Sequence, residues 1–153
     1  MADQLDDDEL GAYFALVAAG DLVQRAVASQ LREHGLTPVQ FSVLAHLLAQ
    51  PGGLRMSDLA DSLVVSRSGL TYQVIQLEKA GLLTRTGSVG DDRGVIARLT
   101  DAGRAKVTAA FPGHVALVRE NFLDLITPDE MGILSSSLQR VVTKLRRGKA
   151  TTD

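Results

Sequence analysis

Cysteine is absent from the 153 residues of the chain, and so is tryptophan. Without cysteine the chain can form no disulfide bond, thiol redox sensor or cysteine-based metal site. Aromatic residues make up only 4% of the sequence, so a core must consist mainly of leucine, valine and alanine, a composition that favours helices. The length is that of one domain with a sizeable core.

Long apolar runs and export signals are also lacking. No continuous apolar run approaches the roughly 20 residues that a membrane-spanning helix needs, so a membrane partner is not expected. The opening residues, MADQLDDDEL, are acidic and lack the basic and apolar regions of a signal peptide. These features predict a cytoplasmic protein.

Motifs of catalysis and of cofactor binding are missing as well. No Ser/His/Asp set has local support, and VSRSGL lacks the glycine two residues before a serine that a nucleophile elbow requires. No phosphate-cradling glycine motif precedes a helix. His34, His46 and His114 are dispersed, so a zinc site would need carboxylates from distant segments. We therefore expect neither an enzyme nor a bound metal or cofactor.

Charge is distributed unevenly although the formal net charge is only −2. Residues 1–54 carry a net charge of −5, residues 55–106 carry +2 and residues 107–153 carry +1. A mildly basic middle third is compatible with nucleic-acid binding, above all if a dimer brings two copies of it together.

Helical patterns fill most of the chain. Apolar periodicity predicts a helix over residues 8–33 and a second one from Pro38 to just before Pro51, with Thr37 and Gln40 at the spacing of a capping box. Two shorter helices follow. Ser57 is expected to cap the first of these and Ser66 the second, whose buried stripe is Leu70, Val74 and Leu77.

The two short helices are separated by only about three residues, which is the spacing of a helix-turn-helix. After Gly81 the period changes, and LLTRT and VIARL flank the loop GSVGDDRG, which predicts a hairpin. A hairpin in this place makes a winged helix-turn-helix. Thr100 should then cap a helix that reaches about residue 126 and is kinked or interrupted at Pro112-Gly113. Thr127 opens the last helix.

The second short helix has a polar face that we expect to enter a DNA major groove. Its hydroxyl, amide and guanidinium groups are of the kind that bind base edges and phosphates, its N-terminus attracts phosphate, and a glycine allows close backbone approach. The expected DNA contacts here and at the start of the preceding helix are Arg55, Ser57, Ser66, Arg67, Ser68, Gly69, Thr71, Tyr72, Gln73 and Gln76. In the plainer interpretation Arg67 is a surface arginine and Tyr72 and Gln76 are solvated. Glu78 and Lys79 are expected on a solvated face.

The segment LADSLVVSRSGLTYQVIQLEKAGLLTR followed by DDRGVIARLTDAGRAKV resembles the multiple-antibiotic-resistance-regulator (MarR) family of bacterial transcription factors. The resemblance covers nearly the whole chain and is most specific over residues 55–106. It implies that Arg93 of the wing reaches the DNA minor groove or backbone and that Asp91 orients it, although Arg93 could merely pair with Asp91 or Asp92. Arg85 is the one arginine of the first wing strand, where relatives often have more basic residues.

The resemblance also implies a mainly α fold with a small β-hairpin wing, in which terminal helices join two copies into a homodimer. The predicted organisation is a single domain over 1–153, with a DNA-binding lobe at 37–100, dimerisation helices at 1–34 and 101–147, and a polar tail at 148–153. Related proteins bind small aromatic acids in a cleft between the lobe and the dimer helices. Tyr13, Phe41 and His46 are candidates to line such an effector cleft, and a partly buried, hydrogen-bonded imidazole is the plainer interpretation of His46.

These features together predict a homodimeric, ligand-responsive regulator that binds double-stranded DNA, represses transcription and recognises a pseudo-palindromic operator. Activation instead of repression would use the same chemistry. The alternative hypothesis is a winged-helix module that has lost DNA binding and docks a partner protein.

Overall fold

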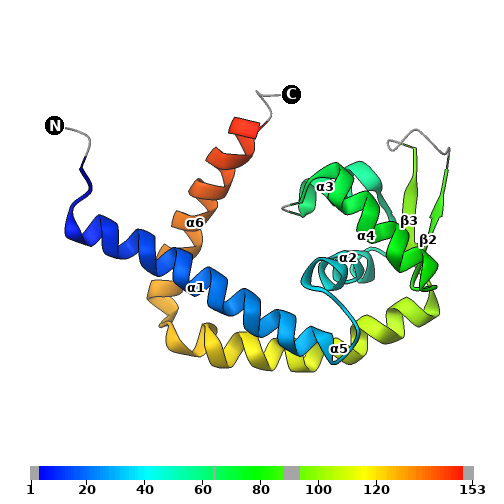
Figure 1. Cartoon of the computed structure of the whole chain (residues 1–153), viewed down its shortest axis with the longest axis horizontal. Coiled ribbons are helices and arrows are strands. Elements are labelled where there is room, and N and C mark those ends of the chain that lie inside the picture. The colour runs from blue at the N-terminus through cyan, green and yellow to red at the C-terminus, as the bar shows by residue number, and fades with distance from the viewer. Residues whose placement is uncertain (1–3, 64, 88–93, 150–153) are drawn as a thin grey trace. The chain divides into compact units, whose positions relative to one another are not determined.

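A computed structural model describes residues 4–63, 65–87 and 94–149 of the chain (Figure 1). The chain forms two compact units, residues 1–117 and residues 118–153. The expected mainly α fold with a small antiparallel sheet is confirmed. In chain order the elements are α1 (Asp7–Arg32), α2 (Pro38–Leu48), β1 (Leu54–Arg55), α3 (Met56–Ser62), α4 (Arg67–Lys79), β2 (Leu83–Thr86), β3 (Ile96–Leu99), α5 (Asp101–Asn121), the 3-10 helix η1 (Leu123–Leu125) and α6 (Pro128–Lys149).

The helix starts follow the capping signals with one exception. Thr37 and Gln40 form the predicted capping box of α2, and the Ser66 side chain caps α4. Ser57 does not cap α3, because that helix begins one residue earlier, with Arg55 as an N-cap that makes no side-chain cap hydrogen bond. Arg55 already lies in extended backbone as the end of β1, so the strand sets where α3 begins.

The sheet has three strands in the order β1-β3-β2, all antiparallel, rather than the two that the hairpin pattern predicted. β2 and β3 form the expected hairpin, and β1 adds a two-residue edge in which Leu54 pairs with Ala97 and Arg55 with Ile96. Figure 1 shows the hairpin beside the C-terminal end of α4. The strand that leads into α3 and the two strands of the wing therefore belong to one hydrogen-bonded sheet.

One hydrophobic core lies within the unit of residues 1–117. The predicted stripe of α4 is confirmed, with Leu70, Val74 and Leu77 all nearly inaccessible to solvent. Around it are buried side chains from the end of α1, from α2, from α3, from the sheet and from the first half of α5. The helix α4 therefore rests on the core through one face and presents the opposite face to solvent.

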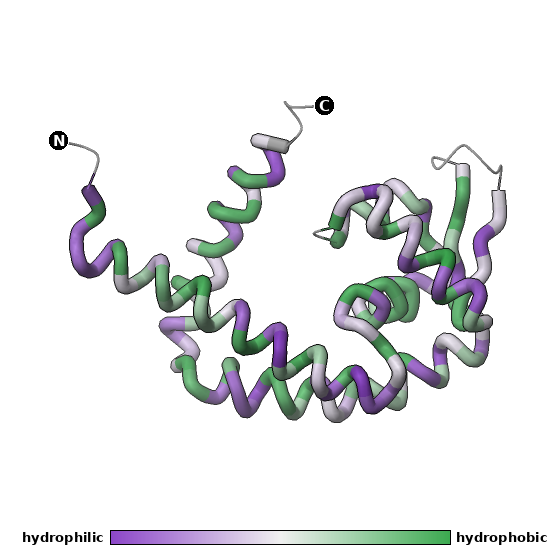
Figure 2. Tube along the Cα trace, viewed as in Figure 1, coloured by the Kyte–Doolittle hydropathy of each residue, from purple (hydrophilic) through white to green (hydrophobic). Residues whose placement is uncertain are grey.

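Most of α1 lies outside this core, since only Val27 and Leu31 are buried. Figure 2 shows apolar residues along the whole helix and not only at its buried end. By length and composition α1 could cross a membrane, with a hydropathy of 1.2 over its most apolar window. This test averages the hydropathy over a window, and the expectation drawn from continuous apolar runs stands, because Asp21 and Arg25 interrupt the run.

The helix α5 continues through Pro112, so of the two predicted outcomes the interruption is wrong, and the kink stays a prediction. It ends at Asn121 instead of near residue 126, because Phe122 leaves helical backbone (φ −145°, ψ −63°) and η1 follows. Proline removes only one backbone donor from a long helix, and α5 keeps its helical hydrogen bonds on either side.

In the second unit, α6 begins with the predicted capping box of Thr127 and Glu130. Hydrogen bonds from the Thr127 backbone and hydroxyl lower the pKa of the Glu130 carboxyl. No described residue of α6 is buried, and its apolar residues Ile133, Val141 and Leu145 are exposed.

Candidate nucleic-acid interface

The start of α4 is a polar, exposed helix end. Ser66 Oγ accepts a hydrogen bond from the Gly69 backbone N–H at 3.1 Å and lies 3.4 Å from Ser68 Oγ. The Thr71 hydroxyl donates to the Arg67 carbonyl at 2.9 Å. Ser66, Arg67 and Ser68 are all exposed. These contacts fix the first turn of the helix while its guanidinium, hydroxyl lone pairs and free N–H groups face solvent.

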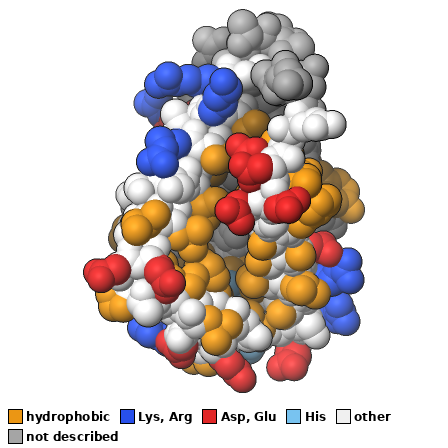
Figure 3. Space-filling model, turned by 90° about the vertical axis from the view of Figure 1, so that its left-hand side faces the viewer, with side chains coloured by type: hydrophobic (Ala, Val, Ile, Leu, Met, Phe, Trp, Pro, Cys, Tyr) orange, Lys and Arg blue, Asp and Glu red, His pale blue; other side chains and the backbone are white. Residues whose placement is uncertain are grey.

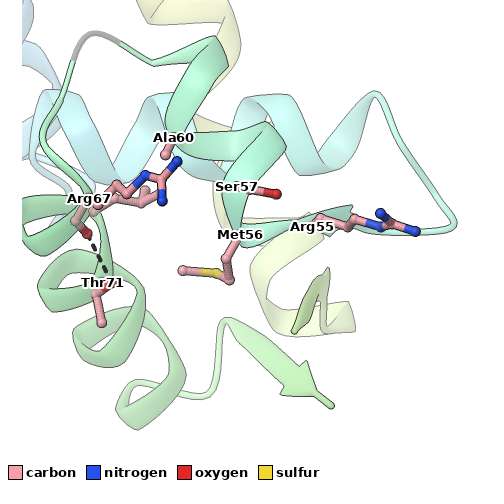
Figure 4. A pocket seen from close by; sticks show the side chains of 7 residues that line it. Arg55, Met56, Ser57, Ala60, Arg67 and Thr71 are labelled. Atoms are coloured by element: carbon pink, nitrogen blue, oxygen red, sulfur yellow. Dashed lines mark hydrogen bonds between the residues drawn. The ribbon is translucent and has the colours of Figure 1, made fainter. Parts of the chain in front are cut away.

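A groove of about 360 Å³ separates the starts of α3 and α4. It brings together four of the predicted DNA-binding residues, Arg55, Ser57, Arg67 and Thr71, above a floor that includes Met56, Ala60 and Leu70. Figure 4 shows Arg67 reaching from α4 towards α3, close to Ala60, while Arg55 extends away from Arg67 on the far side of Ser57.

The electrostatic character of this groove is positive. Its lining contains two arginines and no acidic residue. Among the described residues, neither Arg55 nor Arg67 forms an ion pair. The Ser57 hydroxyl and the two unpaired guanidinium groups can donate to phosphate oxygens and to the acceptors of base edges, whereas the Thr71 hydroxyl already donates to the Arg67 carbonyl.

Arg85 occupies a different environment. Its Nε and Nη2 donate to Glu78 Oε2 at 3.2 and 3.0 Å, and its backbone N–H donates to Glu78 Oε1 at 3.1 Å. Arg85 pairs in register with the buried Ala97, so it points to the covered face of the sheet. Glu78 is thus not on a solvated face as expected, and the pair ties the end of α4 to β2.

Arg98 is a cation that the sequence pattern did not single out. It lies opposite Thr84 in the hairpin register, and its Nη1 donates to the Thr86 hydroxyl at 2.9 Å. Because neighbouring residues of a strand point to opposite faces, Arg98 lies on the face away from the buried Ala97. Arg55 pairs with Ile96 and therefore lies on the same outer face.

Of the remaining predicted DNA contacts, Tyr72 is 61% exposed, and Gln73 and Gln76 are half-buried on α4. The wing residues Arg93 and Asp91 lie outside the described residues.

The effector-cleft candidates are not brought together within one chain. Phe41 is buried, with its ring centroid 5.3 Å from that of Phe111 and 4.5 Å from that of His114. His46 is half-buried and its Nδ1 lies 2.7 Å from the Ser42 carbonyl of its own helix. Tyr13 is exposed near the other end of α1.

The distance between Tyr13 and Phe41 can be estimated from the position of Gln30, near the C-terminal end of α1. Gln30 donates to the Ala110 carbonyl at 3.4 Å, so the end of α1 lies beside the part of α5 that contacts Phe41. Tyr13 is separated from Gln30 by 17 helical positions, or about 25 Å at 1.5 Å per residue. Any cleft that includes both Tyr13 and Phe41 therefore needs more than this chain.

His114 is the other notable imidazole. Burial lowers the pKa of its ring, because the charged form is desolvated there. Its Nδ1 is buried without a hydrogen-bond partner among the described residues, as is the Oε1 of Gln30.

Known proteins resemble this chain over nearly its whole length. Residues 34–94 match the profile of the MarR family. The chain is 32% identical over 130 residues to the HTH-type transcriptional repressor MdtR of Bacillus subtilis (strain 168), a match covering 85% of this chain and 81% of that protein.

Two solved structures extend the likeness to three dimensions. Sco3205, a MarR family transcriptional regulator from Streptomyces coelicolor in complex with DNA, is 30% identical with a TM-score of 0.87, covering 95% of this chain and 92% of that one. CouR from Rhodococcus jostii RHA1, bound to p-coumaroyl-CoA, is 26% identical with a TM-score of 0.76, covering 92% and 95% respectively.

Proposed function

Because this chain belongs to the MarR family of DNA-binding transcriptional regulators, we propose that it is a homodimeric, ligand-responsive repressor of a pseudo-palindromic operator. The family consists of regulators and not of enzymes, in agreement with the expectation from the sequence. Such a regulator acts where the DNA is, in the cytoplasm. The relative MdtR is named a repressor, and Sco3205 was solved in complex with DNA.

The groove between the starts of α3 and α4 carries this proposal. It places the unpaired guanidinium of Arg67 beside the Ser57 and Thr71 side chains, at the exposed end of a helix whose other face is buried. A helix supported in this way can enter a major groove with its N-terminal turn. Arg67 would then bind a base edge or phosphate, and the Ser57 hydroxyl and the free backbone N–H groups would bind phosphate.

The proposed contact surface keeps the predicted residues with one exception and one addition. Arg85 is left out, because Glu78 already neutralises its guanidinium. Arg98 is added as a phosphate contact on the outer face of the sheet. Arg93, oriented by Asp91, remains a proposed wing contact. The complete set is Arg55, Ser57, Ser66, Arg67, Ser68, Gly69, Thr71, Tyr72, Gln73, Gln76, Arg93 and Arg98.

A second copy of the chain is the proposed occupant of the exposed apolar surfaces. Figure 3 views the side that carries the start of α1 and shows hydrophobic side chains spread over the surface. The large exposed apolar side chains of the terminal helices include Phe14, Val17, Leu22, Ile133, Val142 and Leu145. Leaving so many in water is costly, at about 25 cal/mol per Å². We propose residues 37–100 as the DNA-binding lobe and residues 1–34 and 101–147 as the dimerisation helices of one domain.

The ligand is proposed to be a small aromatic acid or a derivative of one. CouR binds p-coumaroyl-CoA, an aromatic acyl thioester. Tyr13, Phe41 and His46 remain the proposed lining, with Tyr13 supplied by the second copy because it lies far from Phe41 in its own chain. A ligand that favours a dimer with the wrong distance between the two copies of α4 would release DNA.

Selection of DNA by the purified protein is the direct test of this proposal. Wild-type protein is used to select duplexes from a random library at moderate salt, and its mass is measured by sedimentation. The proposal predicts a dimer and a selected site with two inverted half-sites one helical turn apart, about 34–36 Å.

Failure to select DNA, together with weak retention on heparin that does not respond to salt, would reject the proposal in favour of the protein-docking alternative. A monomer that selects a single half-site would reject the homodimer. The proposed ligand is tested in a separate experiment. Added salicylate or p-coumarate should raise the melting temperature of the protein and weaken its DNA binding.

A further inference from the structure

Thr100 connects the segment after α4 with the first turn of α5. Its hydroxyl donates to the Gly81 carbonyl at 2.6 Å and accepts a hydrogen bond from the Gly103 N–H at 3.0 Å. Its backbone N–H donates to the Leu82 carbonyl at 3.2 Å. One residue thereby bonds to two successive carbonyls beyond α4 and to the start of α5.

Those two carbonyls belong to residues whose own N–H groups are bonded to α4. The Gly81 N–H donates to the Glu78 carbonyl, and the Leu82 N–H donates to the Leu77 carbonyl, both at 2.9 Å. Gly81 has a φ of +73°, which reverses the chain at the helix end. Gly81 and Leu82 therefore hold the last turn of α4 through their N–H groups and Thr100 through their carbonyls.

Gly103 permits this close approach. A Cβ at this position would collide with the carbonyl oxygen of Leu82, so no other residue fits without displacing the two segments. Glycine inside a helix costs roughly 1 kcal/mol relative to alanine. This destabilising residue lies at the point where the first turn of α5 contacts Leu82, in the segment after α4.

We propose that the α4–α5 clamp, formed by Gly81, Leu82, Thr100 and Gly103, makes Thr100 a positioning residue for DNA recognition. The inference rests on the proposed function, in which α5 is a dimerisation helix and the distance between the two copies of α4 selects the operator. Because the clamp links the two helices through backbone atoms and one hydroxyl, a tilt of α5 moves α4 with it. The clamp therefore transmits the geometry of the dimer to the recognition helix.

Three substitutions separate the clamp from simple helix capping. Thr100→Ser keeps both hydrogen bonds of the hydroxyl. Thr100→Val removes both while keeping the shape. Thr100→Asp keeps the acceptor that caps Gly103, but a carboxylate cannot donate to the Gly81 carbonyl. The aspartate variant therefore loses only the hydrogen bond from the side chain to the Gly81 carbonyl.

The readout is discrimination between two operators. One is the duplex selected by wild-type protein, and the other has a single base pair inserted between the half-sites, which adds about 3.4 Å and a rotation of about 35°. Discrimination is the ratio of the two dissociation constants. Thr100→Ser should keep the wild-type ratio, whereas Thr100→Val and Thr100→Asp should lower it about threefold to tenfold, the factor that corresponds to one hydrogen bond.

Several results would overturn the proposal. Wild-type discrimination in Thr100→Asp would show that the cap alone is needed. An equal loss of affinity for both operators in the valine and aspartate variants would indicate general destabilisation. Melting temperatures check folding, and if Thr100→Val fails to fold, the serine and aspartate variants decide. Failure of the wild-type protein itself to select DNA is a separate result that rejects the proposed function.

Discussion

The two ends of α4 are held in opposite ways. At its C-terminal end Glu78 receives three hydrogen bonds from Arg85, and the next residues join Thr100 of the neighbouring segment. At its N-terminal end the described side-chain hydrogen bonds of Ser66 and Thr71 all stay within the first turn. Side-chain hydrogen bonds tie one end to the wing and to the segment before α5, whereas those described at the other end are all local.

In the proposed function, this difference gives the two ends of α4 separate roles. The C-terminal end orients the helix, and the N-terminal end contacts DNA. The attached end loses little conformational entropy when DNA binds, because its orientation is already set, and such preorganisation favours affinity. The open end keeps the Arg67 guanidinium and the serine hydroxyls hydrated, so they can exchange water for base edges and phosphates. Four substitutions test whether the two roles are as distinct as the contacts indicate.

Leu77→Ala, at the attached end, should have the largest effect on stability. The side chain is only 2% exposed, and its removal leaves a cavity in the core. The free energy of unfolding should fall by about 2–5 kcal/mol, measured by urea denaturation. Tyr72→Ala on the exposed face of the same helix is the control and should change stability by less than about 0.5 kcal/mol. Equal losses in both variants would contradict the burial pattern.

Arg67→Ala, at the N-terminal end of α4, should have the opposite effect: it should weaken DNA binding and leave the stability of the protein unchanged. The melting temperature should stay within error, because the guanidinium forms no ion pair among the described residues. DNA affinity should fall by about 1–3 kcal/mol and specificity should relax at one position of the half-site, measured by fluorescence anisotropy. Lys79→Ala, exposed at the other end of the helix, is the matched control. Similar losses in both variants would reduce Arg67 to a general electrostatic contribution.

Local signals account for what the sequence could predict. Three features depend only on residues within one or two helical turns and could therefore be predicted without the fold. They are the capping boxes, the Leu70-Val74-Leu77 stripe and the glycine at the end of α4. The polar face of α4 was found for the same reason. Its neighbour Arg55 was also selected from the sequence, although its place in a strand was not.

Tertiary contacts account for what the sequence could not predict. β1 is only two residues long, too short for any alternation to be seen, yet it decides where α3 begins and why Ser57 is not its cap. The faces of Arg85 and Arg98 follow from the hairpin register, which a loop rich in glycine leaves undetermined. The close approach at Gly103 is visible only once α5 is packed.

Glu78→Gln should loosen the attached end without opening the core. The amide keeps an acceptor for the Arg85 backbone but loses the charge that pairs with its guanidinium. A half-buried ion pair of this kind should contribute about 1 kcal/mol of stability. A double-mutant cycle with Arg85→Gln measures the coupling. The exposed Arg25–Asp21 pair on α1 is the control and should couple by less than about 0.5 kcal/mol, so equal coupling energies would argue against a structural role for Glu78.

Arg98→Gln should have the smallest effect and extends the comparison to the two faces of the wing. Arg98 lies on the outer face without an acidic partner among the described residues, whereas Arg85 on the covered face is neutralised by Glu78. Loss of one phosphate contact should weaken binding to all sequences alike and reduce the slope of log K against log salt by about 1. Arg85→Gln should leave that slope unchanged, because its charge is already compensated. If the slope responds to Arg85 and not to Arg98, DNA approaches the wing from the other side, and the attached end of α4 is part of the contact surface after all.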